Sequence, residues 1–337
     1  MKTPQTLILN TIILLLLPLV FSSCLKDTYE INNCNTTTYL HTDPISLQAQ
    51  ALITGANLIG LSTKYKTLHF DSTASEAIMA EPPSSFKKNH TVDTTIVLGS
   101  KVLTLTPKTG ATGKYVLFFH GGAYGLNVAA SAYENSYGEI IKRTGVTIVL
   151  PDYKLAPYHT YKEAYALFQV VYDSLVAKVG AANVIIMGDS AGGALSIGFA
   201  QKLKIEGKTL PNQVIALSPW LDITLSNPEI SNIQDPGLNA ESLREAGIAW
   251  AGGTDLSFYQ LSPINGPLEG LPTISIFIGG RDMFLPDNIK LRDKMSATCS
   301  RLNFYEYPQM LHVWMGLLPN APESRKAYNQ IADLINK

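Results

Sequence analysis

Short apolar runs alternate with stretches of helical periodicity from about residue 115 to the end of the chain. The apolar runs are rich in β-branched and aromatic residues and lie at residues 115–119, 146–150, 184–187, 214–217, 274–278 and 302–307. Apolar residues at helical spacing fall between them, near residues 130–143, 161–178, 191–205, 286–297 and 323–335. This alternation predicts an α/β protein with a mostly parallel sheet that helices cover on both faces.

Two further patterns precede this alternation. Residues 44–62 carry an apolar stripe at helical spacing, and β-branched runs at residues 94–98 and 102–105 flank Gly99-Ser100. The flanked turn predicts an antiparallel hairpin. One domain is therefore expected over residues 44–337, with a core that begins at residue 93.

The first residues have the pattern of an export signal. A basic residue, Lys2, precedes an apolar stretch over residues 7–21, and small residues follow it. The stretch is shorter than a membrane span, and Pro18 interrupts it. Residues 1–23 are therefore predicted to be a signal peptide.

Phe21-Ser22-Ser23-Cys24 resembles a bacterial lipoprotein signal, in which the cysteine is acylated and becomes the mature N-terminus. The resemblance implies an exported protein that a lipid on Cys24 anchors to a bacterial cell membrane, on its periplasmic or surface face. Leucine is usual at the position of Phe21. Secretion with Cys24 unmodified and an uncleaved anchor both remain open.

Residues 24–43 are polar and predict a tether between the anchor and the domain. Cys34 lies in this tether, and Cys299 lies near the other end of the chain. Export would permit a disulfide between them. No spacing rule supports the pair, so two unpaired thiols are the expectation.

Composition narrows the possible functions. Hydrophobic residues make up 46% of the 337 residues and charged residues 16%, which is enough for a large core and unlike a disordered chain. The net charge of −1 gives no reason to expect nucleic acid or a strongly charged substrate. The cysteines and histidines are scattered without metal-ligand spacing, so no metal is expected.

Reactive residues follow several of the predicted strands directly. They are His120-Gly121-Gly122 after one strand, Asp189-Ser190 after another and Asp282 after a third, with His312 after the last. The carboxyl ends of parallel strands share one edge of a sheet, where ligands bind. These groups are therefore expected to meet.

Gly188-Asp189-Ser190-Ala191-Gly192 stands between a predicted strand and a predicted helix, which is the context of a nucleophile elbow. A serine nucleophile needs a base and a carboxylate that orients it. His312 is the only histidine after Ser190, and Asp282 follows the strand at residues 274–278. Two other carboxylates remain alternatives for the acid, Asp287 and Asp222.

A glycine turn supplies the expected oxyanion hole. The N–H groups of Gly121 and Gly122, with that of Ala191, can point at one substrate oxygen because no side chain intervenes in the turn. His120 precedes the glycines and is expected to be a structural residue that hydrogen-bonds in the loop, not a second base.

Five motifs in order resemble the hormone-sensitive-lipase-like esterases, the fold-3 branch of the α/β hydrolases. They are His120-Gly121-Gly122-Ala123-Tyr124, Asp152-Tyr153-Lys154-Leu155-Ala156-Pro157, Gly188-Asp189-Ser190-Ala191-Gly192-Gly193, Leu217-Ser218-Pro219-Trp220-Leu221-Asp222 and Leu311-His312-Val313. The resemblance implies an α/β-hydrolase fold, carboxylesterase activity without a cofactor, and a small helical cap mainly over residues 44–92. The sequence departs from the family at Ala123, Lys154 and Tyr158, which puts substrate preference in doubt more than the reaction.

The predicted reaction is hydrolysis of a small-molecule ester through an acyl-enzyme on Ser190. Short or medium acyl esters and acetylated saccharides are the expected substrates, with Tyr124 and Asp189 as substrate-binding residues. A serine peptidase or amidase on the same fold is the alternative. A catalytically inactive binding module is a further one.

Overall fold

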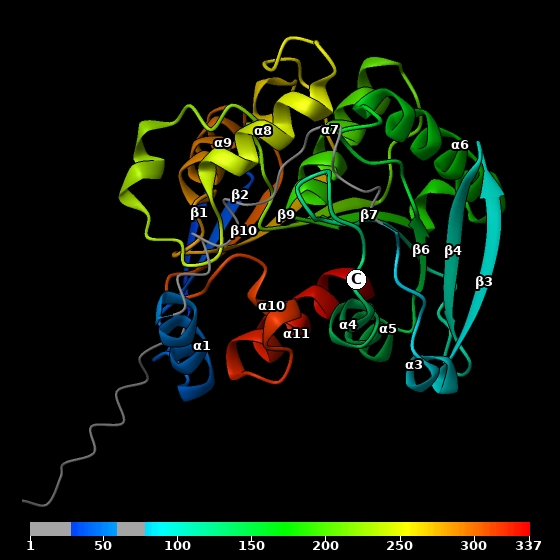
Figure 1. The fold of residues 1–337 in the computed structure, drawn as a ribbon, viewed down its shortest axis with the longest axis horizontal. Helices are drawn as coiled ribbons and strands as arrows, with labels where there is room; N and C mark the ends of the chain where they lie inside the picture. Colours follow the sequence, from blue (N-terminus) through cyan, green and yellow to red (C-terminus); the bar gives the residue numbers. More distant parts are fainter. Residues whose placement is uncertain (1–27, 59–77) are drawn as a thin grey trace, which may run out of the picture.

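A computed structural model of the protein describes residues 28–58 and 78–337, and the centre of this part is a single twisted sheet (Figure 1). The strand order across the sheet is β1-β2-β10-β9-β8-β7-β5-β6-β4-β3. Neighbours from β2 to β6 in this order pair in parallel, and the outer pairs β1·β2, β4·β6 and β3·β4 are antiparallel. The strands are β1 (Thr28–Asn33), β2 (Thr36–His41), β3 (His90–Val97), β4 (Ser100–Pro107), β5 (Tyr115–Phe119), β6 (Thr147–Pro151), β7 (Val184–Asp189), β8 (Gln213–Leu217), β9 (Thr273–Gly279) and β10 (Leu302–Tyr307).

Helices cover both faces of the sheet, as the sequence predicts (Figure 1). One face carries α6 (Tyr161–Val179), α7 (Ala191–Ile205), α8 (Ala240–Ala251) and α9 (Leu285–Ala297). The other carries α1 (Leu47–Leu58), α3 (Ser84–Asn89), α4 (Ala130–Ala132), α5 (Glu139–Thr144), α10 (Trp314–Leu317) and α11 (Pro322–Asn336).

The central strands are apolar throughout because both of their faces are buried. In β5, Leu117 and Phe119 point into the core under α6 and α7, while Val116 and Phe118 point into the core beside α5 and α11. All four side chains are at most 1% exposed. Strands of this kind lose the alternation of polar and apolar residues that a half-exposed strand shows.

The prediction of a polar tether is wrong for residues 28–41. These residues form the β1–β2 hairpin at one end of the sheet. β2 pairs in parallel with β10, from Thr36 opposite Leu302 to Leu40 opposite Glu306. The ring of Tyr39 stacks on that of Tyr305 at 4.5 Å. Backbone pairing with β10 and stacking on Tyr305 thus hold this segment in the sheet, although its polar sequence is like that of a linker.

The expectation of two unpaired thiols is also wrong. Cys34 lies in the two-residue turn between β1 and β2 and forms a disulfide with Cys299, with the two Cα atoms 5.3 Å apart. Cys299 lies in the turn that joins α9 to β10. The disulfide therefore ties the N-terminal hairpin to the strand beside it.

Other N-terminal predictions fall partly outside the described residues. The signal peptide, Cys24 and residues 59–77 of the predicted cap lie outside them. The described helices of that cap, α1 and α3, bury Ala49 and Phe86 in the same core cluster as α5 and α11. Among residues 28–58 and 78–337, no helix has both the length and the apolar character that crossing a bilayer requires.

Candidate active site

Ser190 occupies a sharp turn between β7 and α7. Its backbone has φ 53° and ψ −121°, a strained conformation for a residue with a side chain. A Cβ atom on Gly192 would collide with the carbonyl oxygen of Phe119, and one on Gly188 would collide with the carbonyl oxygen of Gly192. The two glycines are therefore required by close backbone approach, as the elbow pattern predicts.

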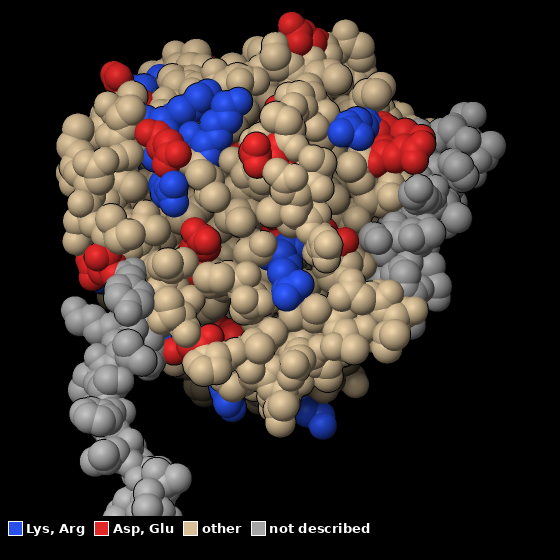
Figure 2. All heavy atoms as spheres, turned by 90° about the vertical axis from the view of Figure 1, so that its left-hand side faces the viewer, with Lys and Arg blue, Asp and Glu red and all other residues tan. Residues whose placement is uncertain are grey.

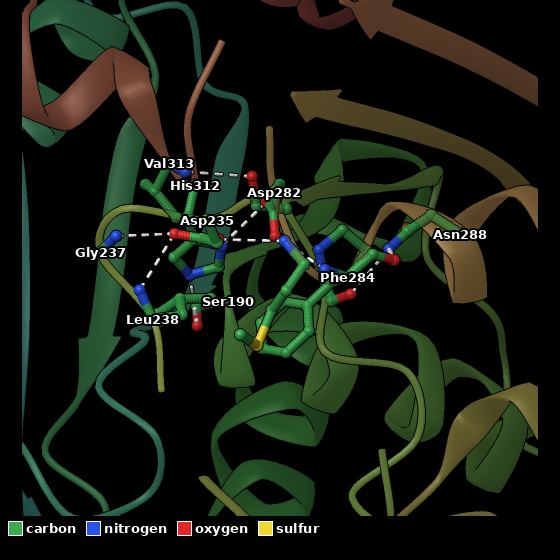
Figure 3. A network of polar contacts seen from close by, with 12 residues as sticks. Ser190, Asp235, Gly237, Leu238, Asp282, Phe284, Asn288, His312 and Val313 are labelled. Carbon is green, nitrogen blue, oxygen red and sulfur yellow. Dashed lines mark hydrogen bonds and ion pairs between the residues drawn. The ribbon is translucent and has the colours of Figure 1, made fainter. Parts of the chain in front are cut away.

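Three side chains from separate strand ends form one hydrogen-bonded chain (Figure 3). His312 Nε2 lies 2.9 Å from Ser190 Oγ, and His312 Nδ1 lies 2.9 Å from Asp282 Oδ2. The Asp282 carboxylate is fully buried, and the His312 side chain is 14% exposed. The structure thus brings together the nucleophile, base and acid that the sequence predicts.

The turn after β9 orients Asp282. Its other oxygen, Oδ1, accepts the N–H of Phe284 at 3.0 Å, and its own N–H donates to Gly279 O. The two alternative acids bind elsewhere. Asp287 accepts the side-chain amide of Asn227 at 2.9 Å, and Asp222 accepts the hydroxyls of Thr224 and Ser226.

His312 is carried by the loop after β10 and held there by Ser218, the residue that follows β8. Val313, the next residue, has φ 45° and donates its N–H to Ser218 Oγ at 3.1 Å. The ring of Phe284 meets the imidazole edge-on, with centroids 5.1 Å apart. These contacts restrict rotation of the imidazole, so that Nε2 stays directed at Ser190.

The surroundings of His312 favour its protonated form. Burial alone would lower the pKa of His312, but the charge and hydrogen bond of Asp282 outweigh it, with Asp235 and Asp189 adding to the effect. The pKa of His312 is therefore raised above its usual value. An imidazolium formed when His312 takes a proton is stabilised in the same way.

The glycine turn after β5 is held by Asp189. The Gly121 N–H donates to Asp189 Oδ1 at 3.1 Å. Burial raises the pKa of Asp189 to about 6, although the Gly121 hydrogen bond opposes the rise. This geometry corrects two predictions. Gly121 was predicted as an oxyanion donor, but its N–H is directed at the Asp189 carboxylate. Asp189 was predicted to bind substrate, but its side chain holds the glycine turn. Gly122 and Ala191 remain the predicted oxyanion donors.

His120 and Ala123 have structural positions in the same turn. His120 is 2% exposed, its Nδ1 lies 2.7 Å from Gly121 O, and its ring stacks on that of Tyr153. Burial lowers the pKa of His120 to about 4, so the ring is neutral near pH 7. Ala123 has φ 51°, a left-handed backbone conformation that glycine adopts more readily than alanine.

Tyr124 does not line an accessible pocket, which corrects its prediction as a substrate-binding residue. The side chain is 1% exposed and stacks on Trp250 at 4.8 Å and on Trp220 at 5.3 Å. Trp220 stacks in turn on Phe284. These four rings, all buried, form a row of stacked aromatic side chains, and Phe284 at its end contacts the His312 ring.

Sequence reasoning missed Asp235, which lies in the loop before α8. Its Oδ2 accepts the N–H of Met283, the residue after Asp282, at 3.0 Å, and Figure 3 shows its carboxylate beside His312 and Asp282. The local signal was the turn sequence Asp235-Pro236-Gly237. That signal predicts a turn but does not indicate what the turn contacts.

Charged side chains are scattered over the one face of the molecule that Figure 2 shows. On the face in Figure 2, acidic and basic side chains occur in small groups on a mostly uncharged surface, which accords with 26 basic and 27 acidic residues in the chain. Within the described ranges, no three histidine, cysteine, aspartate or glutamate side chains gather as a metal site would require.

The fold and the hydrogen-bonded chain at Ser190 are those of an α/β hydrolase, and comparison with known proteins agrees. The family model described as the alpha/beta hydrolase fold matches residues 116–316. The chain belongs to this family, and within it the chain groups with carboxylesterases. The resemblance predicted from the five motifs is confirmed.

Individual relatives carry esterase names. An esterase of Acinetobacter venetianus is 30% identical over 67% of this chain and 76% of its own length. An acetyl-hydrolase of Streptomyces hygroscopicus is 27% identical over 64% of this chain and 73% of its own length. A solved structure from Staphylococcus aureus, described as an esterase, has a TM-score of 0.69 and 31% identity, covering 86% of this chain and 93% of that one.

Proposed function

We propose that this carboxylesterase hydrolyses its ester through an acyl-enzyme on Ser190. The observation that carries the proposal is the chain Asp282–His312–Ser190, with both hydrogen bonds at 2.9 Å. Ser190 Oγ attacks the ester carbonyl while His312 Nε2 takes its proton. The N–H groups of Gly122 and Ala191 stabilise the oxyanion.

His312 then returns the proton to the leaving alcohol. Water next attacks the acyl-enzyme, and His312 acts as base for the second time. Asp282 holds the Nδ1 tautomer in place and stabilises the imidazolium in both steps. The contacts of His312 with Ser190 and with Asp282 support these roles.

Short acyl groups, acetyl above all, are the proposed acyl half of the substrate, from simple esters or acetylated saccharides. Tyr124, Trp220 and Phe284 stack in a row that ends beside His312 and are at most 1% exposed, so a long acyl chain cannot extend into the space that these rings fill. The acetyl-hydrolase name of one relative points the same way.

Replacing the nucleophile tests the mechanism. Ser190→Ala is expected to lose roughly 10³-fold or more of the activity towards p-nitrophenyl acetate, because no other group forms the acyl-enzyme. A fluorophosphonate probe should label the wild-type chain at Ser190 and leave the variant unlabelled. The control is Ser257→Ala at an exposed serine. Wild-type rates in Ser190→Ala would contradict the acyl-enzyme mechanism.

Amide hydrolysis is the second candidate, because the same three groups can cleave an amide. A matched pair of substrates, an acetate ester and an acetamide of one aromatic leaving group, separates the two activities. We expect kcat/KM to favour the ester. A preference for the amide would assign the chain to the peptidases or amidases of this fold.

We also propose export and lipid anchoring through Cys24. The signal pattern over residues 1–23 supports export. The Cys34–Cys299 disulfide supports it independently, because such bonds persist in oxidising compartments outside the cytosol. Metabolic labelling with a fatty acid should mark the wild-type chain and the Cys34→Ala control, and should fail in Cys24→Ala. Label that persists in Cys24→Ala would overturn the anchor.

A further inference from the structure

Asp235 lies in the loop that joins the short 3-10 helix Pro228–Asn232 to α8, far from Asp282 in the chain. Three backbone N–H groups donate to its carboxylate: Gly237 at 2.8 Å and Leu238 at 3.0 Å on Oδ1, and Met283 at 3.0 Å on Oδ2. The first two close a turn in its own loop. The third joins that loop to the turn that carries the acid.

Two consecutive N–H groups of one turn therefore hold two carboxylates side by side. The Met283 N–H binds Asp235, and the Phe284 N–H binds Asp282 (Figure 3). A carboxylate of this kind is a stronger acceptor than a neutral group, so the contact fixes Met283 firmly. Because Met283 follows Asp282 directly, this contact also restrains the acid.

Two negative charges in one place are costly unless a positive charge forms beside them. Burial and the neighbouring Asp282 raise the pKa of Asp235, and His312 opposes the rise. The charged groups that act on His312 are Asp282, Asp235 and Asp189. The repulsion between the Asp235 and Asp282 carboxylates is therefore offset when His312 takes a proton. This protonation is a step of the proposed mechanism.

We propose that Asp235 is a positioning residue of the ester hydrolysis: it fixes the turn that carries Asp282 and supplies a second negative charge that stabilises the His312 imidazolium. The proposal rests on the function proposed for Ser190. Asp282 keeps its own role, since only Asp282 hydrogen-bonds the imidazole. Asp235 acts through the turn and through its charge.

Asp235→Asn removes the charge and keeps the shape of the side chain. The midpoint of the acid limb of kcat/KM is expected to fall by about 0.5 to 1 pH unit, since the loss of a nearby negative charge lowers the pKa of a histidine. On the alkaline plateau kcat should fall roughly 3- to 10-fold with KM nearly unchanged. An NMR titration of the His312 ring should show the same downward shift.

The matched control is Asp255→Asn. Asp255 closes the same type of turn, accepting the Ser257 N–H at 2.9 Å, and lies on an exposed loop. It should leave the midpoint and kcat at their wild-type values. Asp235→Glu keeps the charge and lengthens the side chain, so it should retain the wild-type midpoint while kcat falls.

The proposal is overturned if the His312 midpoint of Asp235→Asn equals that of the wild type, or if Asp235→Glu lowers the midpoint as far as Asp235→Asn does. Should Asp235→Asn fail to fold, an unshifted kcat in Asp235→Glu would overturn the positioning role. The NMR titration does not depend on turnover, so it tests the role of Asp235 alone. A failure of the Ser190 mechanism would appear instead in the activity of Ser190→Ala.

Discussion

At the scale of single residues, His312 combines burial with proximity to negative charge. Its ring is hydrogen-bonded on both nitrogens, to Ser190 and to Asp282. The carboxylates around it outweigh the effect of burial on its pKa. The histidine of the proposed reaction thus lies in an electrostatic environment that strengthens it as a base.

The pH dependence of the wild-type enzyme follows from this environment. Since the pKa of His312 is raised above 6.5, the ring stays protonated, and therefore inactive as a base, up to a higher pH. The acid limb of kcat/KM for p-nitrophenyl acetate should have its midpoint above 6.5, with a plateau on the alkaline side. Rates measured from pH 5 to 9 check this, and a midpoint at or below 6.5 would contradict it.

Asp189 offers a second test at this scale. Asp189→Ala removes the acceptor of the Gly121 N–H, so the glycine turn loses its support and kcat should fall about 10-fold. Asp189→Asn retains an acceptor oxygen and should lose less. Steady-state kinetics on both variants measure the difference. An increase in KM with kcat unchanged would instead restore the substrate-binding role predicted from the sequence.

The sequence was sufficient to predict Ser190, Asp282 and His312 as one group, because their order along the chain and the presence of one histidine after Ser190 leave few alternatives. Ser190 stands in a recognisable turn, and His312 is the only histidine that follows it. Tyr124 and Asp235 were beyond such reasoning. Whether Tyr124 faces a pocket or two indoles, and whether Asp235 reaches Met283, depends on how distant segments pack.

At the scale of elements, the β7–α7 elbow has a strict requirement for glycine at 192. Gly192→Ala would place a Cβ against the carbonyl oxygen of Phe119 in β5, and should destabilise the fold by about 3 kcal/mol. Gly55 in α1 has open space around it, so Gly55→Ala should be neutral or stabilising by about 0.5–1 kcal/mol. Urea unfolding of both variants measures the contrast, and equal stabilities would refute the clash.

The strands and helices were predicted correctly where the local sequence alone determines the secondary structure. Buried parallel strands read as continuous apolar runs, and the β3–β4 hairpin carries its own turn, with Val97 paired to Ser100. The β1–β2 hairpin was missed because its stability comes from β10, which is far away in the chain. The β-branched run Thr36-Thr37-Thr38 before Tyr39 was the available signal, and its polarity obscured it.

At the scale of the whole molecule, the disulfide joins positions 265 residues apart. Loss of the bond in Cys34→Ser/Cys299→Ser should lower the free energy of unfolding by about 2–5 kcal/mol. Reduction of the wild type should produce a similar loss. Thermal or urea denaturation measures both. Esterase activity of the folded variant at 25 °C should persist, because β9, β10 and the loop after β10 still hold Asp282 and His312. An unchanged stability would contradict the structural role.

The same disulfide makes residues 34–299 a closed covalent ring. Ser190 and Asp282 lie within the ring, while His312 lies outside it, in the loop after β10, the strand that begins three residues beyond Cys299. One peptide bond cut anywhere inside the ring opens it without releasing a fragment. If the chain is exported as proposed, it would remain one molecule after a protease makes a single cut inside the ring, and the two pieces should separate on a gel only after reduction.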